Sequence, residues 1–182
     1  MKITNTKING LIIIEPEVFK DDRGAFIESW NFKKFQEIGI NDNFVQDNQS
    51  ISSKGVLRGL HFQNSPHAQT KLVRVVRGSV LDVAVDLRNN SSTYGKYYSI
   101  ILSDKNFKLC YIPKGFAHGF VALEDNTIFS YKCSDMYNKE SEGCLLWNDQ
   151  DLGIDWNINN PIISQKDMQG LYFKDFKSKF ND

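Results

Sequence analysis

The chain has 182 residues, of which 41% are hydrophobic and 13% aromatic. This is enough for one domain with a substantial core and leaves little room for a second, so we expect a single domain over residues 1–182. Lysine plus arginine and aspartate plus glutamate each number 22. Because the charges balance, nothing attracts the whole chain to nucleic acid or to an anionic membrane surface, and neither is expected as a partner.

The apolar run over residues 11–14 is interrupted by a glutamate and a proline, and it is too short for a signal segment or a membrane span. Three cysteines, Cys110, Cys133 and Cys144, form an odd set without CxxC spacing, which favours neither a disulfide framework nor a zinc site. These features predict a soluble protein of the reducing cytoplasm.

The first predicted element is a short helix over Phe32–Ile38, in which Phe32 and Phe35 share a face and Gly39 supplies the stop. Short β-rich runs punctuated by glycine, asparagine and proline dominate residues 10–129, as expected for an antiparallel sandwich or barrel. The clearest predicted strands are Leu72–Val76, Val80–Leu87, Tyr97–Leu102, Leu109–Ile112 and Thr127–Cys133. A second helical signal follows Ser164, so the pattern predicts a mainly β barrel with short flanking helices.

The run VLDVAVDL is the most regular of these strands. Val83, Val85 and Leu87 alternate with Asp82, Ala84 and Asp86, so the two sets lie on opposite faces of a strand. The pattern therefore predicts a strand with one polar face.

His61 lies in the strand-like run GVLRGLHFQ, where alternation puts Leu57, Gly59, His61 and Gln63 on one face. An imidazole on an inward face is suited to general-base catalysis, because its unperturbed pKa of about 6.5 lies near the operating pH. A hydrogen-bonded histidine of the core is an equally good interpretation of the same residues.

His118 lies in IPKGFAHGF, where a proline and two glycines mark a turn that feeds a strand. A histidine-based metal site would pair it with an HxH motif and a glutamate, but residues 61–63 read His-Phe-Gln. A catalytic metal normally has three protein ligands, so no metal is expected. His67, in the polar stretch NSPHAQT, is predicted to be a solvated loop residue.

Tyr131 shares one face of the run TIFSYKC with Thr127, Phe129 and Cys133. A phenol there is suited to proton donation, although buried tyrosines are more often packing groups with one hydrogen bond. Lys71 follows a polar loop and precedes the apolar LVRVV; it has the position of a pocket-mouth residue, but the pattern favours an ordinary exposed lysine.

Asp167 ends the tetrapeptide SQKD, which matches the Ser-x-x-acid pattern of a helix-capping box. A structural role in the cap is therefore the first interpretation, and a second role requires contact with a distant histidine.

Taken together, several segments resemble the dTDP-4-dehydrorhamnose 3,5-epimerase family, and they follow family order from Phe19 to Asp167. The matching stretches are DDRGAFIESW, FVQDNQSISSKGVLRGLHFQ, AQTKLVRVVRGSVLDVAVDLR, STYGKYYSIILS, IPKGFAHGFVAL, YKCSDMY, WNDQDLGIDW and PIISQKD. The departures are small: Ala25 stands where the family often has an aromatic residue, and Phe62 replaces a frequent tyrosine.

The resemblance implies a cupin-type jelly-roll barrel, a homodimer with exchanged N-terminal strands, and cofactor-independent epimerisation of a nucleoside-diphosphate 4-keto-6-deoxy sugar. It assigns His61 as general base, Asp167 as the carboxylate that orients it, Tyr131 as the acid on the opposite face, and Lys71 as the cation beside the C4 oxygen.

The resemblance also implies binding roles for further residues. Gln46, Asn48 and Arg58 match pocket residues, with Arg58 at the diphosphate; Arg23 and Glu28 match residues that reach the nucleotide from the neighbouring subunit. His118 and Tyr137 match positions near the sugar and the base, and Asp82 is the expected partner of His118. Since alternation places Arg58 opposite His61, both face one pocket only if the strand contains a bulge, for which Gly59 is the obvious place.

Several alternatives stay open at this level. The same catalytic residues would serve an enzyme that inverts C3 alone, or one that acts on a GDP-linked 4-keto heptose or hexose in capsule or polysaccharide synthesis. A metal-dependent cupin enzyme and a non-catalytic sugar-nucleotide-binding cupin are more distant possibilities.

Overall fold

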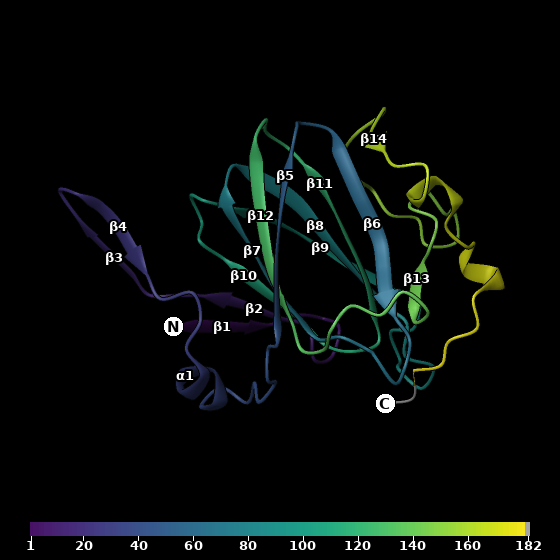
Figure 1. Cartoon of the computed structure of the whole chain (residues 1–182), viewed down its shortest axis with the longest axis horizontal. Coiled ribbons are helices and arrows are strands. Elements are labelled where there is room, and N and C mark those ends of the chain that lie inside the picture. Colours follow the sequence, from purple (N-terminus) through teal and green to yellow (C-terminus); the bar gives the residue numbers. More distant parts are fainter. Residues whose placement is uncertain (181–182) are drawn as a thin grey trace.

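The computed structural model describes residues 1–180, and antiparallel strands dominate this part of the chain (Figure 1). One six-stranded sheet has the order β1-β2-β10-β7-β12-β5. Its strands are β1 Lys2–Asn5, β2 Ile12–Glu15, β10 Leu109–Ile112, β7 Lys71–Arg77, β12 Thr127–Cys133 and β5 Gln46–Ser52.

The second sheet has the order β13-β6-β11-β8-β9, with β14 also paired to β6. Its strands are β13 Glu142–Cys144, β6 Val56–Gln63, β11 Phe116–Ala122, β8 Ser79–Asp86, β9 Tyr97–Ser103 and β14 Ile162–Ile163. The two sheets form a jelly-roll barrel of the cupin type, as expected from the sequence.

Three groups of apolar side chains hold the layers together. The interior group joins both sheets, with Val73 and Phe129 from the first sheet and Phe120 from the second. A second group covers the outer face of the second sheet, where β6 and β8 pack against the C-terminal segment. The third covers the outer face of the first sheet beneath α1 (Phe32–Gln36). Burial on both faces supplies most of the stabilisation of such a barrel.

The expected polar face of the VLDVAVDL strand is present, and it is buried. Val83 and Val85 pack under the C-terminal segment, while Asp82 and Asp86 are 1% and 0% exposed. A strand in the middle of a covered sheet has no solvated face, so its carboxylates are paired with other side chains: Asp82 bonds to His118 and Asp86 to an arginine and two hydroxyls.

Both helical segments lie where they were predicted, but each is shorter than expected. α1 begins at Phe32 as expected and is capped by the side chain of Asn31. The tail after Ser164 contains only two 3₁₀ turns, η1 (Asp167–Gln169) and η2 (Phe173–Asp175). Within residues 1–180, no helix has the length and hydropathy needed to cross a membrane.

One hairpin belongs to neither six-stranded sheet. β3 (Val18–Asp21) and β4 (Gly24–Ile27) pair only with each other in the described chain, and Figure 1 shows them projecting away from the barrel. Phe19 and Phe26 lie on this hairpin with 53% and 65% of their surface exposed. A projecting apolar hairpin is the kind of surface that another molecule covers.

Candidate active site

A cavity of about 660 Å³ opens between the two sheets, a size typical of small-molecule sites. It is lined by nine of the eleven site residues expected from the sequence: Gln46, Asn48, Arg58, His61, Lys71, His118, Tyr131, Tyr137 and Asp167. The remaining two, Arg23 and Glu28, lie outside it.

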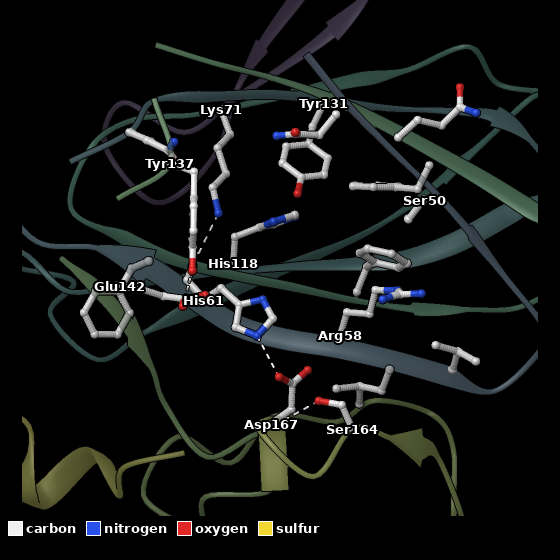
Figure 2. A pocket seen from close by; sticks show the side chains of 18 of the residues that line it. Ser50, Arg58, His61, Lys71, His118, Tyr131, Tyr137, Glu142, Ser164 and Asp167 are labelled. Atoms are coloured by element: carbon white, nitrogen blue, oxygen red, sulfur yellow. Dashed lines mark hydrogen bonds and ion pairs between the residues drawn. The ribbon is translucent and has the colours of Figure 1, made fainter. Parts of the chain in front are cut away.

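His61 and Asp167 meet at one wall of the cavity. Nε2 of His61 lies 2.8 Å from Oδ1 of Asp167, and the backbone N–H of Gly59 donates to Oδ2. Burial opposes ionisation of Asp167, but the hydrogen bonds from His61 and Gly59 outweigh it and lower the pKa of this carboxyl. The carboxylate holds the imidazole proton on Nε2, and Figure 2 shows the other ring nitrogen, Nδ1, directed into the cavity.

A register shift in β6 turns Arg58 and His61 to the same side. The strand pairs His61 with His118 and Arg58 with Phe120, so three steps along β6 face two along β11. This is the bulge that the sequence led us to expect at Gly59.

The bulge requires glycine on both strands. Gly59 has φ of +142°, and a Cβ there would lie 2.6 Å from the Cα of Gly119. The shift also overturns one expectation: Leu57 does not share the face of His61 but packs with Leu60 in the outer apolar group.

Lys71 lies on β7, and its Nζ donates to the backbone oxygen of His61 at 3.4 Å. The expectation of an ordinary exposed lysine is wrong, since the residue is only 9% exposed. Burial lowers the pKa of its ammonium group, although Cys133, Asp82 and Glu142 oppose the shift. The side chain points inward because its neighbour Leu72 fills the outer apolar group, and alternation turns Lys71 to the other face.

Tyr131 lies on β12, in the sheet opposite β6, and its hydroxyl points into the cavity from the other side (Figure 2). Its ring packs with Phe129, as alternation predicted. Burial is the main cause that raises the pKa of its phenol, so the group stays protonated at neutral pH. An imidazole and a protonated phenol therefore face the same space from opposing walls.

His118 and Asp82 form a second, deeper histidine–carboxylate pair. Nε2 of His118 lies 2.8 Å from Oδ2 of Asp82, as expected from the sequence, and the histidine is 7% exposed. Burial lowers the pKa of His118, although Asp82 opposes the shift. The ring is therefore neutral near pH 7 and offers a hydrogen-bonding group to the cavity.

Amide side chains of β5 and the guanidinium group of Arg58 also line the cavity. Gln46 accepts a hydrogen bond from the backbone N–H of Tyr137 at 2.8 Å and donates to Asn48 at 3.1 Å. Arg58 donates from Nε to the hydroxyl of Ser52 at 3.3 Å. These contacts fix the amides and leave the rest of the guanidinium group facing the cavity.

Glu142 is a lining residue that the sequence did not indicate. Its carboxylate accepts hydrogen bonds from Tyr137 Oη at 3.0 Å and Lys166 Nζ at 2.6 Å. It lies on β13, which has only three residues, too few for alternation to reveal which way a side chain points. The ion pair with Lys166 fixes the Glu142 carboxylate, and the hydrogen bond from Tyr137 to this carboxylate holds the tyrosine ring at the cavity mouth.

Arg23 and Glu28 are not brought to the cavity within this chain. Arg23 lies on the projecting hairpin and pairs with Asp21, and Glu28 pairs with Lys34 of α1 at 3.3 Å. Both are remote from the nine lining residues, so any role at a ligand requires a second copy of the chain.

Comparison with known proteins gives one consistent result. Residues 5–175 match the family model described as dTDP-4-dehydrorhamnose 3,5-epimerase. A protein of that name from Methanothermobacter thermautotrophicus is 52% identical over 169 residues, which cover 91% of each chain.

Two solved structures agree. The dTDP-4-dehydrorhamnose 3,5-epimerase from Elizabethkingia anophelis is 55% identical with a TM-score of 0.92, covering 96% of this chain and 97% of that one. A dTDP-6-deoxy-D-glucose-3,5-epimerase from Legionella pneumophila, in complex with dTDP-4-keto-L-rhamnose, is 47% identical with a TM-score of 0.93, covering 97% and 94%.

Proposed function

The chain belongs to the dTDP-4-dehydrorhamnose 3,5-epimerase family, and from this premise we propose that it inverts C3 and C5 of a dTDP-linked 4-keto-6-deoxy sugar. The reaction converts dTDP-4-dehydro-6-deoxyglucose to dTDP-4-dehydrorhamnose. One observation carries the proposal: His61 and Tyr131 face one cavity from opposite walls, with Lys71 beside them.

His61 is the general base. The 4-keto group acidifies the protons on C3 and C5, and Nδ1 of His61 removes one of them while Nε2 keeps its hydrogen bond to Asp167. The ionised Asp167 stabilises the imidazolium that forms and fixes the ring, so Asp167 acts through His61. General-base catalysis of this kind contributes about 10²–10⁴-fold to the rate.

Lys71 stabilises the enolate. Removal of the proton leaves negative charge on the C4 oxygen, and a buried ammonium group is a preorganised partner for it. The lysine is held by the backbone oxygen of His61, so the cation lies next to the base that creates the charge. Removing one such donor typically costs about 10²–10³-fold in kcat.

Tyr131 is the general acid. The carbon is inverted only if the new proton arrives from the face opposite the base, and the Tyr131 phenol approaches from the opposing sheet. Its raised pKa keeps the proton available at neutral pH. His61 and Tyr131 therefore act on opposite faces of the same enolate.

The remaining lining residues hold the substrate. Arg58 binds the diphosphate through charge-assisted hydrogen bonds, and Gln46 and Asn48 present amides to the nucleotide. His118, neutral and oriented by Asp82, contacts the sugar. Tyr137, held by Glu142, presents its ring to the base.

The active enzyme is a homodimer in which the β3–β4 hairpin of each subunit lies against the other. The hairpin projects from its own barrel (Figure 1) with exposed Phe19 and Phe26, and β5 is an unpaired edge of its sheet in the described chain. In this arrangement Arg23 and Glu28 of one subunit reach the nucleotide in the cavity of its partner.

We place the enzyme in the cytoplasm as a single domain over residues 1–182. Its three cysteines, Cys110, Cys133 and Cys144, are all free thiols, which suits a reducing compartment. Apart from the β3–β4 hairpin, the strands between residue 2 and residue 163 all belong to the two sheets that enclose the cavity, which supports a single unit.

Proton NMR of the purified protein with a panel of nucleotide sugars tests this proposal. The panel contains dTDP-4-dehydro-6-deoxyglucose, its GDP-linked counterpart and a GDP-linked 4-keto heptose. We expect rapid formation of dTDP-4-dehydrorhamnose and slow or no reaction of the GDP sugars. A product inverted at C3 alone would reduce the assignment to a 3-epimerase. Preference for a GDP-linked sugar would contradict the assignment of a dTDP-linked substrate.

A further inference from the structure

Three metal-ligating side chains meet at one wall of the cavity, and only two of them take part in the proposed reaction. Ligand atoms of His61, Cys144 and Asp167 all lie within 4.8 Å of one another. They come from three separate elements, β6, β13 and η1, and Cys144 is the direct cross-strand partner of His61. Cys144 has no part in the epimerisation described above.

We propose that His61, Cys144 and Asp167 bind a thiophilic divalent cation, with Zn²⁺ as the best match, and that this binding switches the catalytic base off. The inhibitory half of the proposal rests on the proposed function, because it takes His61 as the base. The binding half rests on the three side chains alone.

The ligand set selects the kind of cation. One imidazole, one thiolate and one carboxylate are typical zinc ligands, whereas Mg²⁺ and Ca²⁺ prefer oxygen alone. Tetrahedral zinc with bonds of about 2.0 Å to nitrogen and oxygen separates those two atoms by roughly 3.3 Å. His61 Nε2 and Asp167 Oδ1 are 2.8 Å apart, so a small opening of this pair admits the ion.

The surroundings of the thiol favour a cation. Cys144 is half-buried, and the carboxylates of Asp167 and Glu142 lie near enough to act on the charge of its thiol. The same carboxylates, Asp167 and Glu142, attract a divalent cation, which supplies the positive charge that the thiolate lacks.

The proton balance explains how binding blocks catalysis. The cation takes the place of two protons, the one on Cys144 Sγ and the one shared between His61 Nε2 and Asp167. The thiol proton leaves to solvent, and the imidazole proton moves to Nδ1, because a neutral imidazole that binds metal through Nε2 carries its proton on the other nitrogen. Nδ1 is the atom that must accept the substrate proton, so the base is occupied.

Equilibrium dialysis with ZnCl₂ tests the binding without any use of enzyme activity. We expect one Zn²⁺ per wild-type chain and at least about 100-fold weaker binding by Cys144→Ala, since even loss of a ligand's outer partner costs about 10–100-fold. Cys110→Ala is the matched control, because Cys110 is a buried thiol of the interior apolar group, and it should bind as the wild type does. Cys144→Ser replaces Cys144→Ala if the alanine variant fails to fold.

Co²⁺ in place of Zn²⁺ reports the ligand directly. A thiolate-to-cobalt charge-transfer band should appear in the wild type and in Cys110→Ala, and it should be missing in Cys144→Ala. Zinc binding of equal strength in wild type and Cys144→Ala, or a cobalt complex without the thiolate band, would overturn the site.

The activity assay then tests the inhibition. Zn²⁺ should inhibit wild-type turnover and EDTA should restore it, while Cys144→Ala keeps its basal turnover and needs about 100-fold more Zn²⁺. Stoichiometric binding of Zn²⁺ without inhibition would refute the inhibitory half of the proposal, while the binding half would stand. Absence of epimerase activity in every sample would count against the proposed function only, because dialysis and the cobalt spectrum still report the metal.

Discussion

Asp167 has hydrogen-bond partners both nearby and far away in the sequence, Ser164 and His61. Its backbone N–H donates to the Ser164 hydroxyl at 3.1 Å, as the SQKD pattern predicted. Its carboxylate does not complete the capping box but instead reaches His61, 106 residues earlier. The local pattern therefore predicts the turn, whereas the contact with His61 was expected only from the family resemblance, and the fold brings the two side chains together.

The Asp167→Asn substitution removes the negative charge of this side chain and keeps its size and position. The amide oxygen still accepts the hydrogen bond from His61 Nε2, but the charge that stabilises the imidazolium is lost. A hydrogen bond to a charged group contributes about 1.5–3 kcal/mol, so kcat should fall by about 10- to 150-fold. Asp175→Asn, an exposed acid of the neighbouring 3₁₀ turn, is the control and should leave kcat unchanged. Equal kcat values for the Asp167 variant and wild type would show that the charge of Asp167 does not contribute to catalysis.

Lys71 makes the alkaline side of the pH profile informative. The ammonium must be charged to stabilise the enolate, and burial lowers its pKa from the ordinary value of 10.5. As pH rises through the lowered pKa the charge is lost, so kcat should decline at a pH below 10.5 while the circular dichroism spectrum stays unchanged.

Two variants test whether Lys71 causes this decline in kcat. Lys71→Met should lose about 10²–10³-fold in kcat and show no such decline. Lys132→Met, which removes a lysine paired with Asp47 on the outer side of β12, should keep the wild-type profile. A wild-type profile in Lys71→Met would contradict the assignment.

At the scale of elements, the β6 bulge decides whether the site forms. Gly59→Ala adds a Cβ that meets the Cα of Gly119 at 2.6 Å and forces φ of +142° on an L side chain. Strain of this kind costs about 1–3 kcal/mol, and the displaced strand carries both Arg58 and His61.

We therefore expect Gly59→Ala to lower the free energy of unfolding and, among the molecules that remain folded, to lower kcat/KM. Urea denaturation and turnover measure the two effects. Gly39→Ala is the control: φ there is +86°, but nothing lies within 4 Å of the added Cβ, so it should lose stability alone. Wild-type kcat/KM in Gly59→Ala would show that the bulge does not position the site.

Alternation predicted the strands well and the buried polar groups poorly. The strand Thr127–Cys133 was predicted with its bounds, and its Tyr131 face was correct. Alternation alone favoured an exposed Lys71 and gave no sign of Glu142, because a charged side chain normally lies in water; the closed barrel shows that both line a cavity. The β6 bulge was expected only because the resemblance required Arg58 and His61 on one side.

At the scale of the whole molecule, the projecting hairpin predicts the oligomeric state. Phe19 and Phe26 contact each other with ring centroids 6.3 Å apart and remain largely exposed in one chain. Burying a phenylalanine side chain stabilises by about 1.5–3 kcal/mol, and a two-fold dimer buries each residue twice.

Phe26→Asp should therefore convert the dimer to monomer in sedimentation velocity at micromolar concentration, and KM should rise because Arg23 no longer reaches the partner's cavity. Ile101→Asp, a change at a residue 54% exposed on β9, should leave the dimer intact. A wild-type protein that sediments as a monomer would contradict the exchange of hairpins.

The proposed chemistry requires that both inverted carbons exchange hydrogen with solvent through an enolate. Tyr131→Phe keeps the base and loses the acid, so it should retain exchange while inversion slows. His61→Ala lacks the base, so it should lose both.

Deuterium incorporation in D₂O, followed by proton NMR of dTDP-4-dehydro-6-deoxyglucose with wild type and His61→Ala, tests this directly. We predict that the wild type places deuterium at C3 and C5 and that His61→Ala places it at neither. Epimerised product without deuterium, or undiminished exchange in His61→Ala, would contradict the account.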